Sequence, residues 1–252
     1  MDKYTRARRN DFIKRSYRDQ ADKDYIAART VHRLHLLDQF LWLALQALEK
    51  YLKAILLFND QSTKGIGHDL VEAFTRVEQI STLGCSLSSD DRLFLEYLTG
   101  QGTDRYFERV RSAEGEELLA LDHVVWSVRR FCDDYFFPFD PSQNILRKYS
   151  RAFLESLNTN SVTRSPHRFR LMNKGFIEEV LESAKHRSLR EQLVWKNFYF
   201  GNRKKRRICI NLTRVLSNPS TFMYPQLYQW LMKNVQLDRK TRALLDQQKV
   251  KK

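Results

Sequence analysis

Residues 37–55 carry the sequence pattern that most restricts the fold of this chain. Apolar side chains recur there every three or four residues, at Leu37, Leu41, Ala44, Leu48, Leu52 and Ile55. This spacing places them on one wide face of an α-helix and leaves only a narrow polar stripe. Because such a face has to be covered by other helices, the pattern predicts the central helix of a bundle.

Neighbouring segments have the same helical periodicity. Helices are expected near residues 24–36, 69–80, 89–98 and 116–135, and the 8 glycines and 5 prolines of the 252-residue chain fit long helices with few tight turns. Asp69 and Glu72 have the spacing of a capping box, which would start the helix at residue 69. We therefore expect an antiparallel helical bundle over residues 21–140, preceded by a basic arm at residues 1–20.

The remaining residues, 141–252, are predicted to form a basic and mostly helical region. Helices are expected from Asp140 to Leu157, over 173–190, over 226–235 and over 239–248. Between them, aromatic and branched residues before and after Gly201-Asn202 predict one β-hairpin at about 193–212. The expected fold class is thus mainly α with a single hairpin.

Charge is divided unevenly between these two parts. Residues 1–140 hold 20 Lys and Arg against 23 Asp and Glu, a balance of −3, whereas residues 141–252 hold 24 against 7, a balance of +17. Like charge on that scale repels itself unless a partner neutralises it. The second part is therefore expected to bind a polyanion, with nucleic acid favoured over an acidic protein or a membrane surface.

Basic side chains in two stretches are the candidates for this contact. They are Arg203, Lys204, Lys205, Arg206 and Arg207 at the tip of the expected hairpin, and Arg164, His167, Arg168 and Arg170 before it. Guanidinium groups can bind phosphate through two hydrogen bonds, and lysines act as point charges. The alternative for the run 203–207 is a solvated turn. Trp195, Phe198, Tyr199 and Phe200 could stack on unpaired bases, but a position in the core is the favoured interpretation.

Several functional classes are not indicated by any motif. The sequence has no Walker loop, no Gly-rich dinucleotide turn and no H-E-x-x-H or G-x-S-x-G motif, so no cofactor is expected. His32, His35 and Asp38 form an i, i+3, i+6 row, but a second ligand cluster is missing and no metal site is expected. Three cysteines without C-x-x-C spacing, and no uninterrupted apolar span, predict a cytoplasmic protein with no membrane contact.

One set of spaced residues resembles a known domain. Gln46, Glu49 and Lys53 share a face of the central helix, and His68-Asp69-Leu70 follows at the start of the next. This combination, with Arg105-Tyr106, resembles the HEPN domain (the nucleotide-binding domain of higher eukaryotes and prokaryotes) over residues 22–137. The resemblance implies a bundle of four or five helices that often forms homodimers. It also implies a pocket with the side chains Glu49, Lys53, His68 and Arg105, although an exposed helical ion pair is the favoured interpretation of Glu49 and Lys53.

Many HEPN proteins are metal-independent RNases or toxin partners of nucleotidyltransferases, and others only bind. The nucleases carry an Arg, a polar residue and a nearby His at the last bundle helix, and no His follows Arg105 at that distance. Arg29 and His35 have a comparable spacing, but at about 100° per residue their side chains lie about 120° apart. His68, which could act in acid–base chemistry or only order its loop, completes the candidate catalytic set of His68, Arg29 and His35.

Three hypotheses follow, and an enzyme is not the favoured one. The first is a HEPN-like protein that binds RNA or single-stranded nucleic acid through its basic C-terminal half, in the stress, defence or toxin–antitoxin setting that the resemblance implies. The second is a diverged metal-independent endoribonuclease. The third is an interaction module whose basic half docks an acidic protein partner.

Overall fold

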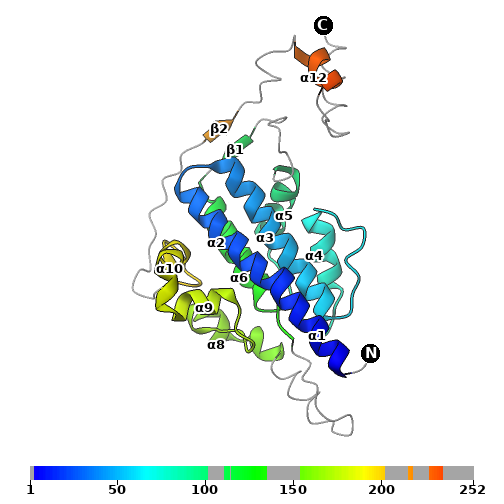
Figure 1. Cartoon of the computed structure of the whole chain (residues 1–252), viewed down its shortest axis with the longest axis vertical. Helices are drawn as coiled ribbons and strands as arrows, with labels where there is room; N and C mark the ends of the chain where they lie inside the picture. Colours follow the sequence, from blue (N-terminus) through cyan, green and yellow to red (C-terminus); the bar gives the residue numbers. More distant parts are fainter. Residues whose placement is uncertain are drawn as a thin grey trace.

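Helices dominate the computed structural model, which describes residues 3–101, 111–113, 115–134, 154–201, 215–217 and 227–234. Figure 1 shows a helical bundle formed by the N-terminal part of the chain, with the segment 154–201 against one side of it. This segment is called the docked segment below. Its helices contact the second helix of the bundle, so it is part of the same packed body.

The chain starts with one long helical run. Helix α1 (Lys3–Ile13) continues through the π-helical segment η1 (Lys14–Arg18) into α2 (Asp19–Arg33). A π turn holds more residues than an α turn, so it rotates the side chains after it relative to those before it. Asn10, Ile13 and Arg18 are all buried, and the N-terminal charged stretch is therefore packed against the bundle from Asn10 on.

Helix α3 (Leu37–Phe58) is the central helix that the apolar spacing predicts. Leu41, Leu48 and Leu52 on its apolar face are completely buried. The helix contacts α2 along its length, and the two are joined by a short turn in which His35 has a positive φ of 61°. Burial of such a wide face explains why helices pack on α3 from several sides.

Three further helices complete the bundle: α4 (Leu70–Glu78), α5 (Ser89–Gln101) and α6 (Glu117–Arg129). Asp69 caps α4 as predicted, since its side chain accepts hydrogen bonds from the backbone N–H groups of Val71 and Glu72. Glu72 binds Arg76 one turn later. The three helices all contact α3, which confirms the predicted helical bundle.

The docked segment consists of short helices. They are α8 (Asn160–Thr163), η2 (Pro166–Arg168), α9 (Phe176–Glu182), η3 (Ala184–His186) and α10 (Arg187–Val194). The single helix predicted over 173–190 is interrupted at Ser183, whose extended backbone ends α9. Arg190 donates to the carbonyls of Val180 and Ser183, so it satisfies groups that this break leaves open.

The β-hairpin predicted at about 193–212 is not supported. Its expected first strand begins inside α10 and continues as turns over residues 195–200, while residues 202–214 lie outside the described part of the chain. Asn197 stabilises these turns, because its side-chain oxygen accepts from the N–H groups of Tyr199 (2.9 Å) and Phe200 (3.1 Å). The aromatic run is therefore a turn against the bundle.

The strands that the structure does describe are short. β1 (Arg111–Ala113) pairs antiparallel with β2 (Val215–Ser217), and Ser112 lies opposite Leu216. Helix α12 (Tyr228–Asn234) follows near the end of the chain. The pair of strands β1 and β2 and the helix α12 lie above the bundle in Figure 1.

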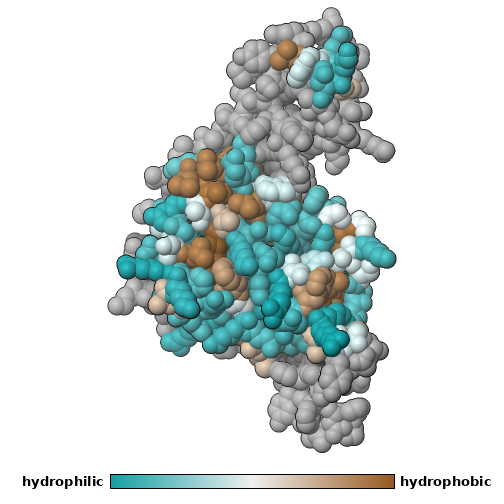
Figure 2. Space-filling model, in the orientation of Figure 1, coloured by the Kyte–Doolittle hydropathy of each residue, from teal (hydrophilic) through white to brown (hydrophobic). Residues whose placement is uncertain are grey.

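The visible face of the molecule is mainly hydrophilic, with separate apolar patches (Figure 2). One patch lies at the upper end of the bundle (Figure 2). Leu34 and Leu36, in the turn between α2 and α3, are exposed. Among the described helices, none combines the length and the apolar composition that crossing a bilayer requires.

Candidate nucleic-acid interface

Arg129 of α6 attaches the docked segment to the bundle. Its guanidinium donates to both carboxylate oxygens of Asp22 on α2 (2.7 and 2.8 Å) and of Glu178 on α9 (2.9 and 2.7 Å). Burial alone would raise the pKa of Glu178, but Arg129 and the backbone N–H groups of Gly175 and Leu171 lower it to about 2. Glu178 is therefore ionised at neutral pH although it is only 1% exposed.

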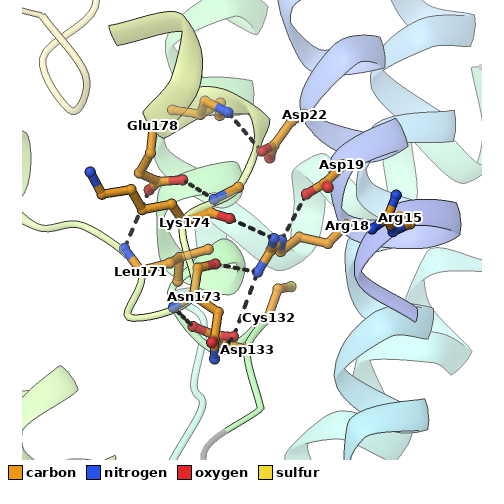
Figure 3. A network of polar contacts seen from close by, with 12 residues as sticks. Arg15, Arg18, Asp19, Asp22, Cys132, Asp133, Leu171, Asn173, Lys174 and Glu178 are labelled. Carbon is orange, nitrogen blue, oxygen red and sulfur yellow. Dashed lines mark hydrogen bonds and ion pairs between the residues drawn. The ribbon is translucent and has the colours of Figure 1, made fainter. Parts of the chain in front are cut away.

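Arg18, which leaves the π-helical segment toward the same region, holds the loop before α9 (Figure 3). It donates to the carbonyls of Asn173 (2.8 Å) and Lys174 (3.0 Å) and to the Asp19 carboxylate (3.0 Å). Asp133 binds the same loop, since it accepts from the backbone and side-chain nitrogens of Asn173. Two bundle residues thus fix the position of this loop.

Arg29 forms a second attachment and is not available for catalysis. It is 1% exposed and binds the buried carboxylate of Asp122. It also donates to the carbonyls of Gln192 (3.2 Å) and Trp195 in the docked segment. His35 lies in the exposed turn after α2, outside the helix that carries Arg29. The two residues therefore do not form a site together.

Glu49, Lys53 and His68 come together as the resemblance implies. The Glu49 carboxylate binds Lys53 Nζ on one oxygen and His68 Nδ1 (2.7 Å) on the other. Lys53 also donates to the carbonyl of Gly67 (2.9 Å), and the Trp42 ring meets the His68 ring edge-on at 6.1 Å. The His68 side chain is 48% exposed, so part of it is open to solvent.

The basic turn, defined here as residues 160–170, presents cations at the surface. Arg164 and Arg168 are exposed, and no Asp or Glu occurs in the sequence from 156 to 177. Arg170 donates to the carbonyls of His167 (2.9 Å) and Phe169 (2.7 Å), which fixes the backbone of the turn. Four predicted contact residues therefore lie in one short turn, two of them exposed arginines and one a structural arginine.

Two other cations of the docked segment are bound by its own carboxylates. Lys174 pairs with Glu182 (2.6 Å), and Arg187 pairs with Glu191 (3.3 Å) across one helical turn. Such exposed pairs are weak, but they lower the local excess of positive charge. The remaining predicted contact residues, Arg203–Arg207, and the pocket residue Arg105 lie outside the described residues.

Comparison with protein families accounts for part of the chain. Residues 15–124 match the family model of the HEPN domain. This segment is similar to the HEPN domain, and it is called the HEPN domain below. The match extends from the π-helical segment into α6 and confirms the resemblance that the spacing of Glu49, Lys53 and His68 indicates. The docked segment lies outside the match, and neither the curated proteins nor the solved structures gave a match.

The HEPN domain holds a second histidine site that the sequence did not indicate. His123 Nδ1 on α6 lies 2.7 Å from the Asp91 carboxylate on α5, and the His123 ring is stacked on Tyr199 of the docked segment. These three residues are far apart in the chain, and no motif connects them. The spacing of His123 and Trp126, three residues apart on one helix, is the one sequence signal for a shared face.

Proposed function

We propose that this protein binds RNA or single-stranded nucleic acid through phosphate contacts from its basic C-terminal half. The HEPN domain supports a nucleic-acid-related role. The single observation that carries the proposal is the basic turn, where Arg164 and Arg168 are exposed in a stretch without acidic residues. Such a stretch attracts phosphate and carries no carboxylate of its own that would repel it.

The attachment of the docked segment supports the same proposal. A phosphate site needs cations whose positions are fixed before binding, because ordering them costs free energy. Arg170 fixes the turn from within, and Phe169 packs edge-on against Trp126 of the bundle at 5.5 Å. The two exposed guanidinium groups can then bind phosphate oxygens through paired hydrogen bonds. Binding of this kind recognises backbone and not sequence.

The test is fluorescence anisotropy with labelled single-stranded RNA at a series of salt concentrations. The logarithm of the binding constant should fall linearly with the logarithm of salt concentration, by about 0.7 for each phosphate neutralised. Replacement of both exposed arginines, Arg164→Gln with Arg168→Gln, should reduce that slope by about 1.4 and weaken binding at low salt.

The matched control removes two exposed cations elsewhere, Arg15→Gln with Lys64→Gln, and should leave the slope unchanged. Weak binding that does not depend on salt would refute the proposal. Equal losses in both double variants would show that only net charge matters. Replacing all of Arg203–Arg207 by Gln tests the second predicted stretch in the same assay.

The His68 site supports a second candidate function, a metal-independent endoribonuclease. Glu49 binds His68 Nδ1, which fixes the ring and leaves Nε2 as the group that can accept or donate a proton. Lys53, bound to the same carboxylate, would supply positive charge near a phosphate.

Cleavage of labelled RNA in the presence of EDTA measures this activity directly. Cleavage should be abolished by His68→Ala and strongly reduced by Glu49→Gln, which keeps the shape of the side chain but removes its charge. His35→Ala is the control, because His35 lies in an exposed turn. RNA that stays intact with the parent protein would exclude this candidate while leaving the binding proposal standing.

A further inference from the structure

A row of aromatic rings crosses the contact between the bundle and the docked segment. Tyr199 is stacked on both His123 (5.7 Å between centroids, 25° between planes) and Trp126 (6.1 Å, 19°). Trp126 in turn meets Phe169 and Phe200 edge-on. Trp126 is the buried end of the row, whereas the side chain of His123 is 43% exposed. The row therefore ends at the surface in an imidazole.

The carboxylate of Asp91 fixes the orientation of the His123 imidazole. His123 Nδ1 binds Asp91 Oδ1 at 2.7 Å, and the other oxygen of Asp91 accepts from the hydroxyl (2.7 Å) and the backbone N–H (3.1 Å) of Ser88. Burial would raise the pKa of Asp91, but hydrogen bonds from His123 and Ser88 outweigh it and lower the pKa. Asp91 thus stays ionised and holds the ring in one plane.

Among the other aromatic residues of the turn after α10, Phe198 is 42% exposed but is not part of the row, whereas Trp195 and Phe200 are mostly covered. The Trp195 ring has Arg33 at 5.1 Å and Lys196 at 5.0 Å from its centroid. Phe200 is buried and packs against Tyr25. Of the rings in the row, His123 is the one that combines a fixed orientation with a large exposed fraction.

We propose that His123 is a stacking site for one unpaired nucleobase of a single-stranded nucleic acid. The base would lie against the exposed part of the imidazole and extend the row that Tyr199 and Trp126 begin. Stacking on aromatic side chains, histidine included, is how proteins hold splayed-out bases, and it tolerates any base. Bases inside a duplex are already stacked on each other, so the site selects unpaired strands.

This inference rests on the proposed function and adds base contact to phosphate contact. Phe169 connects the two, since it belongs to the basic turn and also packs on Trp126. Tyr199 comes from the docked segment, while His123 and Asp91 come from the HEPN domain. The site therefore exists only when the docked segment is in place.

The experiment compares labelled oligouridylate with an abasic ribose-phosphate oligomer of equal length, both titrated with the full chain at constant low salt. The oligouridylate should bind tighter by roughly 5- to 150-fold, the range expected for stacking of one base. His123→Ala should remove this difference by weakening only the oligouridylate complex. His123→Phe, which keeps a ring, should retain most of it, and Phe12→Ala, which removes an exposed ring of α1, should change neither complex.

A measurement on the parent protein covers the case in which His123→Ala does not fold. The Cε1–H proton resonance of His123, assigned by its loss in His123→Phe, should shift upfield on addition of oligouridylate and not with the abasic oligomer. Equal affinity for both oligomers, with no such shift, would overturn the inference while leaving the proposed function intact. Absence of binding to either oligomer would overturn both.

Discussion

The carboxylates of Asp22 and Glu178, one from the N-terminal helical run and one from the C-terminal half, are bound by the same guanidinium, that of Arg129. Because all three groups are buried, each charge depends on the others for the interactions that water would otherwise provide. The attachment of the docked segment is therefore more sensitive to loss of one partner than an apolar contact of similar size would be.

Glu178→Ala should destabilise the protein by about 3–5 kcal/mol, because the buried guanidinium of Arg129 loses two of its hydrogen-bond acceptors. Urea unfolding followed by circular dichroism measures this change. Glu182→Ala is the matched control on the same helix, since its partner Lys174 is exposed and its loss should cost at most about 1 kcal/mol. Equal losses in the free energy of unfolding would show that the buried network contributes no more to stability than an exposed ion pair.

Acid should loosen the docked segment in a defined pH range. The pKa of Glu178 is lowered from 4.5 to about 2 in the folded protein. Between these two pH values the Glu178 carboxylate is mostly protonated in the unfolded chain and mostly ionised in the folded protein. The free energy of unfolding should then fall with decreasing pH by up to about 1.4 kcal/mol per unit, until the pH reaches about 2. Stability measured between pH 5 and pH 2 should show this slope reduced in Glu178→Gln, despite its lower stability at pH 7.

Gly175→Ala should destabilise the protein. A Cβ at this position would lie 3.0 Å from nitrogens of Arg129 and Arg18 and 3.1 Å from an oxygen of Asp22, so the network would have to shift. At Gly100 in α5 a Cβ would meet nothing within 4 Å. Gly100→Ala should therefore stabilise the protein, by roughly 0.5–1 kcal/mol. Thermal unfolding of the two variants should shift the midpoint in opposite directions.

Leu48→Ala should cost about 2–5 kcal/mol, because this side chain of α3 is completely buried and its loss leaves a cavity. Leu93→Ala on α5 removes the same atoms from a side chain that is largely exposed and should change stability by less than about 1 kcal/mol. Chemical denaturation of both variants tests the central position of α3. A small effect at Leu48 would contradict the packing described for the bundle.

Local patterns in the sequence were sufficient to predict the bundle. The apolar spacing of α3 and the cap at Asp69 each depend on residues within a few positions of one another, and both are confirmed. The Glu49–His68 contact could also be predicted, because Glu49 lies on α3 and His68 lies in the loop that joins α3 to α4.

Contacts between distant parts of the chain could not be predicted in the same way. Aromatic residues after α10 have strand propensity, but the burial of Phe200 and the hydrogen bonds of Asn197 favour a turn. The pairing of Arg29 with Asp122, and of His123 with Asp91, depends on which helices become neighbours. A single sequence carries no local signal for that choice.

The docked segment also determines how far this protein can be truncated without loss of its fold. The family match ends at residue 124, ahead of Arg129 and of every partner that the docked segment supplies. A chain shortened to the matched residues would leave Asp22 without a counter-ion, and Arg29 would lose the carbonyls of Gln192 and Trp195. Recombinant fragments of this HEPN domain should accordingly extend to about residue 201. Shorter fragments would expose to solvent the bundle surface whose charged side chains are buried by the docked segment.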